Sequence, residues 1–137
     1  MTYVVLLAFV VQAAVGASLA VTWWRGGRRG VPTVSTHIAS SILGLATWIA
    51  FVVSGSLVPA WAAFAAITVG NTYGDTMLLA RVQRRTGTTS KRRNYPVAVA
   101  AILRGRMPWR VAFHALFAGV VYFSCLGVCI AATFAST

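Results

Sequence analysis

The sequence predicts an all-α fold: a polytopic membrane protein whose single domain is a bundle of four transmembrane helices, with both termini outside the cytoplasm. Hydrophobic residues make up 58% of the 137 residues and charged residues only 9%, whereas soluble domains carry about 25% charged residues. Four segments approach the ~20 apolar residues that a helix needs to cross a bilayer. All twelve lysines and arginines fall in two stretches that this topology places on one side of the membrane.

The apolar segments define the predicted helices in chain order. They cover about residues 3–24, 36–53, 59–80 and 111–134. The first helix ends at RGGRRGVP, whose glycines and proline break it where the charge begins, and Ser35 or Thr36 is the expected N-cap of the second. Only the short uncharged turn SGSLVP separates the second helix from the third. The N-terminus lacks the positive stretch of a signal peptide, so we expect the first helix to be retained as a span.

The basic segment 81–110 is the one substantial loop of the predicted bundle. Its stretch TGTTSKRRN is typical of a mobile, solvated segment. The stretch YPVAVAAIL (residues 95–103) is apolar but too short to span, so we expect a short interfacial helix over about residues 96–103. Such a helix either lies only in the headgroup layer or closes over a pocket on the cytoplasmic side, and the sequence leaves both alternatives open.

The distribution of positive charge predicts the orientation and the partners. Three arginines follow the first span, and nine basic residues lie between the third and the fourth. The positive-inside rule makes this side cytoplasmic, which predicts a multi-pass protein of a bacterial cytoplasmic (inner) membrane. Attraction between these residues and the anionic headgroups of the lipid bilayer accounts for most of the net charge of +11, so nucleic acid is not an expected partner.

The only acidic residue of the chain and its two histidines fall in three predicted helices, in one shallow band near the basic side. With a rise of ~1.5 Å per residue, Asp75 lies ~9 Å from Arg81, and His114 lies ~6 Å from Arg110. His37 lies at the start of the second helix. Ionisable residues inside a membrane are functional candidates by default. We therefore predict a polar site formed by His37, His114 and Asp75.

Smaller residues are expected around this site. Ser40, Ser41 and Asn71 lie at helical spacing from the ionisable residues and are candidate second-shell or proton-site residues. Gln12 and Gly16 mark a polar or small face of the first helix. The cysteines, Cys125 and Cys129, lie one turn apart with no metal or redox spacing, so we expect them to act as small apolar residues.

Several functions are open to such a site. His37 and His114 could ligate the iron of one haem b for membrane electron transfer, with Asp75 holding the distal N–H of one ligand; this is the leading prediction. The same three residues could bind a divalent metal, serve as the general acid and base of an intramembrane enzyme, or move protons in a transporter. The protein could instead be a non-redox accessory or structural subunit of a larger membrane complex, or a homo-oligomer, with Asp75 as an ion-pair partner.

Four stretches of the chain resemble a family of small actinobacterial membrane proteins. They are HIASSILGLATWIAF, AWAAF, GDTMLLAR and HALFA, which begin at His37, Ala60, Gly74 and His114. In that family the second and fourth helices begin with a histidine and the third ends in a Gly-x-x-Met-x-x-x-Arg pattern, and the family has no assigned activity. The resemblance implies the four-helix fold and the pairing of His37 with His114. The chain is also similar, more distantly, to transmembrane b-type cytochromes of the ascorbate-reducing type, which implies at most one haem for two histidines.

Overall fold

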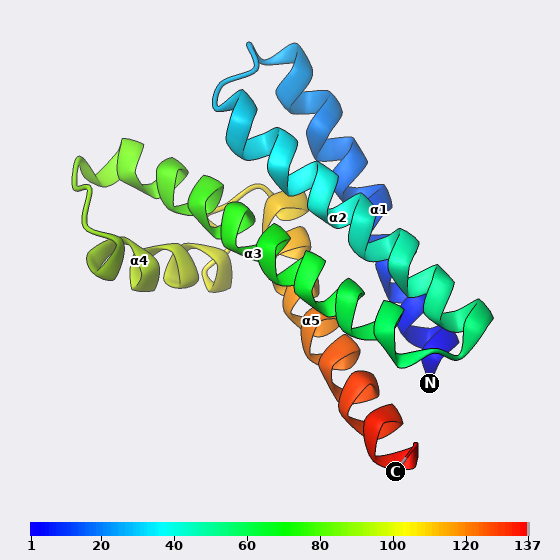
Figure 1. Ribbon diagram of the computed structural model, residues 1–137. Helices are drawn as coiled ribbons and strands as arrows, with labels where there is room; N and C mark the ends of the chain where they lie inside the picture. The colour runs from blue at the N-terminus through cyan, green and yellow to red at the C-terminus, as the bar shows by residue number, and fades with distance from the viewer. Residues whose placement is uncertain (137) are drawn as a thin grey trace.

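The computed structural model describes residues 1–136, which form five α-helices and no strand. The helices are α1 (Thr2–Arg25), α2 (Val31–Ser54), α3 (Leu57–Thr86), α4 (Lys91–Leu103) and α5 (Trp109–Ala135) (Figure 1). The prediction of an all-α protein is therefore confirmed.

Three of these helices are long and apolar enough to cross a membrane, namely α1, α2 and α5. The α3 helix has 30 residues, which is enough length for a span. It falls short in apolar character because its second half carries the polar stretch GNTYGDT and then several arginines. The helix predicted over residues 59–80 is thus present, while its crossing of the membrane stays a prediction.

The expected start of the second helix at residue 36 is wrong by five residues. The α2 helix begins at Val31, after Gly30 in the left-handed conformation, and Pro32 lies in its first turn. Proline is tolerated there because the first backbone N–H groups of a helix have no partner within the helix. Thr36 is consequently not a cap but an interior residue, whose hydroxyl donates a hydrogen bond to the carbonyl of Pro32 at 2.9 Å.

The short helix expected over residues 96–103 is longer than predicted, and half of the stretch expected to be mobile belongs to it. The α4 helix begins at Lys91, and the Ser90 hydroxyl caps it by accepting a hydrogen bond from the Arg93 backbone N–H. Asn94, only 2% exposed, ties the turn before α4 to the end of α3. It accepts from the Thr86 hydroxyl at 2.9 Å and donates to the Thr88 carbonyl at 2.7 Å.

The four long helices associate as two pairs, in which α2 packs mainly on α3 and α1 packs mainly on α5. Small residues bring α2 and α3 very close, since a Cβ added at Gly44 would lie 2.6 Å from the Ile67 Cγ2 atom. Contacts between α3 and α5 join the pairs, including a hydrogen bond of 3.4 Å from the Cys129 thiol to the Ala60 carbonyl. Both cysteines are buried and free, in agreement with their expected role as small core residues.

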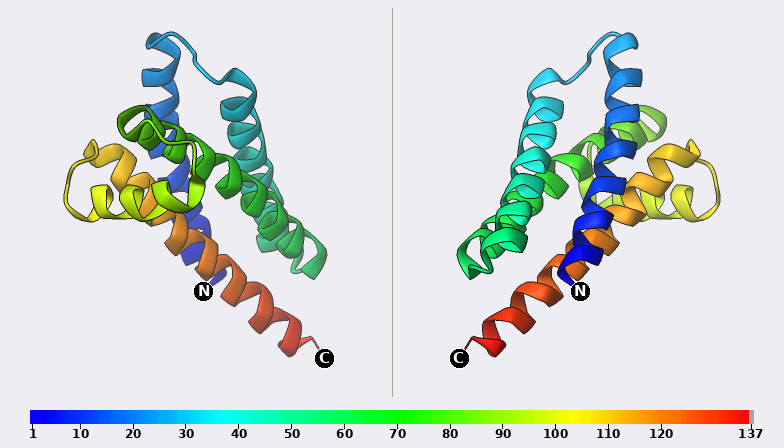
Figure 2. Two further views of the ribbon diagram at one scale, coloured as in Figure 1. Left: turned by 90° about the vertical axis from the view of Figure 1, so that its left-hand side faces the viewer. Right: turned by 90° about the vertical axis from the view of Figure 1, so that its right-hand side faces the viewer.

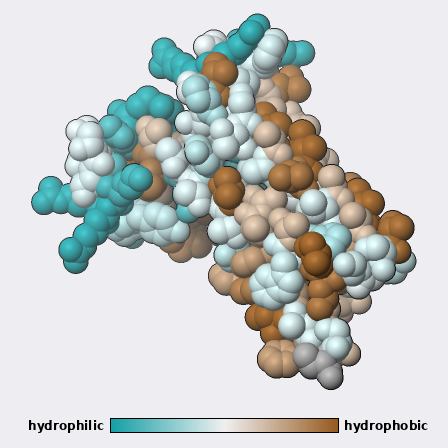
Figure 3. Space-filling model, viewed as in Figure 1, coloured by the Kyte–Doolittle hydropathy of each residue, from teal (hydrophilic) through white to brown (hydrophobic). Residues whose placement is uncertain are grey.

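Polar and apolar surfaces separate along the bundle. The two termini lie at one end, and the α1–α2 loop lies at the other, while α4 runs across the direction of the long helices (Figure 2). Hydrophilic residues gather at the α1–α2 loop and over the α3–α4 region, whereas hydrophobic residues cover much of the remaining surface (Figure 3). Many large apolar side chains on α1, α2 and α5 are exposed, as expected for helices in contact with lipid.

Candidate functional site

The two histidines, which lie 77 positions apart in the chain, meet inside the bundle. The ring centroids of His37 and His114 are 6.0 Å apart, and the ring planes meet at 77°. His37 belongs to the α2–α3 pair and His114 to the α1–α5 pair. The histidine contact therefore lies at the seam between the two helix pairs.

His37 is held by the backbone of α3, the partner helix of α2. Its Nδ1 atom lies 2.8 Å from the carbonyl oxygen of Gly70. A carbonyl only accepts hydrogen bonds, so Nδ1 carries the proton and, in the neutral ring, Nε2 keeps its lone pair. The ring also lies against Gly74, where an added Cβ would come within 3.3 Å of the His37 Cε1 atom. Gly74 thus allows the imidazole to lie directly on α3, and the Gly70 carbonyl accepts its hydrogen bond.

His114 is held in the same way by α1. A Cβ added at Gly16 would lie 3.1 Å from the His114 Cε1 atom, so the ring fills the space that this glycine leaves. One turn earlier, the Gln12 amide N–H donates to the His114 backbone carbonyl at 2.9 Å. Two buried polar atoms beside this contact, Gln12 Oε1 and His114 Nδ1, have no hydrogen-bond partner among residues 1–136. Buried polar atoms are nearly always paired, so this place has unused capacity for a ligand, an ion or a water molecule.

Asp75 is not the partner of either histidine. Its side chain is exposed, and it makes no hydrogen bond or ion pair with any residue from 1 to 136. Asp75 was predicted to hold the distal N–H of one histidine ligand, and for His37 the Gly70 carbonyl holds the Nδ1–H. The reason is the helix period: Gly70 and Gly74 lie on the face that meets α2, and the next residue along, Asp75, is turned about 100° away from it.

The predicted second-shell residues lie close to the site but do not contact the ring nitrogens of the histidines. The Ser41 hydroxyl donates to the His37 carbonyl at 2.7 Å, and the Ser40 hydroxyl donates to the Thr36 carbonyl at the same distance. Both hydroxyls lie beside Gly70, where an added Cβ would come within 3.2 and 3.4 Å of them. Asn71 is partly buried, and its side chain makes no hydrogen bond within the described part of the chain.

The sequence prediction missed the two glycines on which His37 rests. Gly70 supplies the hydrogen-bond acceptor and Gly74 the space. Their spacing in GNTYG is the small-xxx-small pattern that marks close approach of membrane helices. This pattern was available as a signal for the contact surface of α3.

The geometry favours the two imidazoles over a larger metal-ligand set. No group of three or more His, Cys, Asp or Glu side chains within residues 1–136 is arranged to hold a metal ion. Metal–nitrogen bonds of ~2.0–2.1 Å place two imidazole nitrogens on opposite sides of one metal about 4 Å apart. Since each ring centre lies beyond its nitrogen, a centroid separation of 6.0 Å is compatible with two rings that share one metal atom.

Two surface cavities lie away from the histidine rings. One lies between α1 and the first turn of α5, and the other lies between the end of α3 and the start of α4. No family model, curated protein or solved structure matches the chain. The resemblances named above therefore stay predictions, and the residues of the site carry the functional argument.

Proposed function

We propose that α3 is a fourth transmembrane span and that both termini face away from the cytoplasm of a bacterial cell. Both termini lie at the same end of the bundle (Figure 2), and no basic residue precedes Arg25 or follows Arg110. Alkaline phosphatase and green fluorescent protein fused to each terminus test the orientation. Phosphatase activity without fluorescence at both termini is expected, and fluorescence at either terminus would refute the topology.

We propose that the histidine pair ligates the iron of a single haem b and that the protein carries electrons in the membrane. The observation that supports this proposal is the meeting of His37 and His114 from two different helix pairs, with ring centroids 6.0 Å apart. The hydrogen bond from His37 Nδ1 to the Gly70 carbonyl is the kind of contact that orients a metal-ligating histidine and leaves Nε2 for the metal. A haem iron with two histidine ligands supplies one-electron chemistry, with a potential set by its surroundings.

The ring nitrogens of His37 and His114 are suitable ligands for a haem iron, but the packing around the rings does not suit a porphyrin. Glycines of α1 and α3 lie directly against the two rings, and neither of the two cavities described above adjoins the rings, so the packing around them leaves no room for a porphyrin. Binding therefore requires the two helix pairs to move apart at the seam. At the seam, α1 and α2 pack less closely on each other than α2 does on α3, whereas α3 packs on α5 about as closely as α1 does. Each histidine can keep its contacts within its own pair while the pairs separate.

Absorption spectra of the detergent-purified protein, expressed with an adequate haem supply, test the proposal. A sharp Soret band with α and β bands after dithionite reduction is expected for the native chain. His37→Ala and His114→Ala should each lose the low-spin spectrum. Thr47→Ala is a matched control on α2, because the Thr47 hydroxyl bonds only to carbonyls of its own helix, and it should keep the spectrum. A colourless native protein, or a spectrum that survives both histidine changes, would refute the proposal.

A second function, as a subunit of a larger membrane assembly, is favoured by one face of α3. Thr72, Asp75 and Thr76 are exposed on this helix, and an ionisable residue inside a membrane is costly when it faces lipid. Another subunit or a second copy of the chain would cover this polar face. Cysteine crosslinking at Thr72→Cys tests this function, with exposed Ile42→Cys on α2 as the control position. Efficient crosslinks at 72 and few at 42 are expected, and equal yields would argue against a defined interface.

A further inference from the structure

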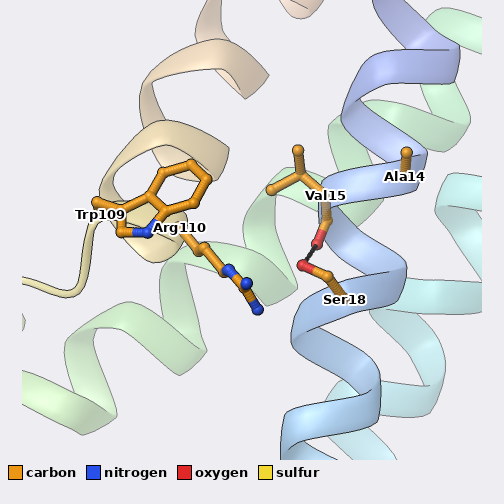
Figure 4. Close-up of a pocket in the computed structure, with 5 residues that line it drawn as sticks. All are labelled: Ala14, Val15, Ser18, Trp109 and Arg110. Atoms are coloured by element: carbon orange, nitrogen blue, oxygen red, sulfur yellow. Dashed lines mark hydrogen bonds between the residues drawn. The ribbon is translucent and has the colours of Figure 1, made fainter.

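A groove lies on the surface between α1 and the first turn of α5, away from the histidine contact. Its volume is about 280 Å³, and it is lined by Ala14, Val15, Ser18, Trp109 and Arg110. Figure 4 shows the Trp109 ring and the Arg110 guanidinium on one wall, with the α1 residues opposite. The groove lies at the end of α5 that follows the basic segment.

The lining combines an apolar floor with a single positive group. Ala14 and Val15 present methyl groups, and the Ser18 hydroxyl already donates a hydrogen bond of 2.7 Å to the Val15 carbonyl. The Trp109 side chain is 69% exposed, as is common for tryptophan at the level of lipid headgroups. The Arg110 guanidinium lies 5.6 Å from the Trp109 ring centroid, within the range of a cation–π contact. The groove thus suits a molecule with an anionic head and an apolar tail.

No acidic side chain among residues 1–136 pairs with Arg110. Among its residues are twelve basic side chains and one acidic side chain, and Asp75 makes no ion pair within the described residues. The counter-charge for at least eleven basic groups must therefore come from outside the chain. In a bilayer the nearest source is the anionic lipid of the cytoplasmic leaflet, which attracts basic residues beside apolar helices.

We propose that the α1–α5 groove is a binding site for one anionic phospholipid, with the lipid phosphate on Arg110 and an acyl chain along Ala14 and Val15. A guanidinium binds phosphate through paired hydrogen bonds, and the floor of the groove continues into the exposed apolar face of α1, at Val10 and Val11. The proposal requires the helices to lie in a bilayer and is independent of haem binding. The groove would be one defined lipid-binding site, in addition to the general attraction of the basic segment to the membrane.

Fluorescence quenching of Trp109 in nanodiscs tests the site. Phosphatidylglycerol with brominated chains, mixed into unlabelled phosphatidylcholine, is compared with the reverse labelling at the same composition. The difference between the native chain and Trp109→Phe isolates the Trp109 signal from that of the other four tryptophans. Stronger quenching of Trp109 by the brominated anionic lipid is expected, and excess inorganic phosphate should not reduce it. Equal quenching by the two lipids would overturn the proposal.

Three variants separate a defined site from a diffuse charge effect. Arg110→Gln should abolish the preference, whereas Arg92→Gln, which removes an exposed charge on α4, should keep it. Ala14→Phe should also abolish it, because this change fills the groove while Arg110 keeps its charge. Circular dichroism establishes that each variant is folded. A preference that survives both groove variants, or that Arg92→Gln reduces as much as Arg110→Gln, would overturn the proposal.

Discussion

Replacing Gly44 with alanine perturbs the packing that brings α2 onto α3 and so positions His37 over Gly70. The added Cβ would lie 2.6 Å from the Ile67 Cγ2 atom and 3.6 Å from the Ala63 carbonyl oxygen. Ile67 is β-branched and has one strongly preferred side-chain rotamer in a helix, so its methyl group cannot turn away freely. Overpacking of this kind costs about 1–3 kcal/mol, whereas alanine gains about 1 kcal/mol over glycine in a helix interior. We expect a net loss of up to roughly 2 kcal/mol in the free energy of unfolding.

Reversible unfolding in mixed detergent micelles, followed by circular dichroism, measures this loss. Gly119→Ala on α5 is the matched control, because no atom lies within 4 Å of its added Cβ, and it should be neutral or stabilising by up to about 1 kcal/mol. The double variant Gly44→Ala/Ile67→Ala removes the clashing methyl group, so the cost of the glycine change should largely disappear in the Ile67→Ala background. Equal effects of Gly44→Ala and Gly119→Ala, or an unchanged cost in that background, would refute the packing argument.

Three further predictions concern single residues. Gly16→Ala should be about 1 kcal/mol less stable than Gly119→Ala in the same assay, because its Cβ would lie 3.1 Å from the His114 Cε1 atom; equal stabilities of the two variants would mean that the ring has free space. Asp75→Asn should change the free energy of unfolding by less than about 0.5 kcal/mol, since no ion pair or hydrogen bond is lost; a larger loss would reveal a partner. Cys125 and Cys129, both 0% exposed, should react with a maleimide only after detergent unfolding, and rapid labelling of the folded protein would contradict their burial.

Those parts of the fold that depend on local sequence were predictable. The ends of α1 and α5 agree with the predicted ranges to within two residues, because the apolar runs end where charged or polar residues begin. The start of α2 was missed because Gly30 and Pro32 usually interrupt helices, although proline is compatible with the first turn. The start of α4 was missed because Asn94 is stabilised by contacts with the end of α3, and a local reading of a polar stretch does not include such contacts.

The sequence predicted that the two histidines form the candidate site, but it did not predict which residues contact them. Depth along each helix brought His37 and His114 to the same level, and their rings do meet. The contacts depend on how each helix is rotated about its axis, which the packing of neighbouring helices determines. That rotation turns Gly70 and Gly74 toward His37 and leaves Asp75 exposed. The positions of the histidines and of Asp75 in the sequence therefore predicted their depth along each helix, but not the direction in which their side chains point.

The hydrogen bonds of Asn94 have a mechanical consequence. The Asn94 amide joins the Thr86 hydroxyl to the Thr88 carbonyl at the corner between α3 and α4. These hydrogen bonds restrict changes in the angle between the two helices. Tilt is how a membrane helix adjusts to a bilayer of different thickness. If α3 spans a membrane as proposed, a tilt of α3 would carry α4 with it and would move the arginines of α4 within the headgroup layer. A change in bilayer thickness would in this way become a change in where the protein presents its positive charge.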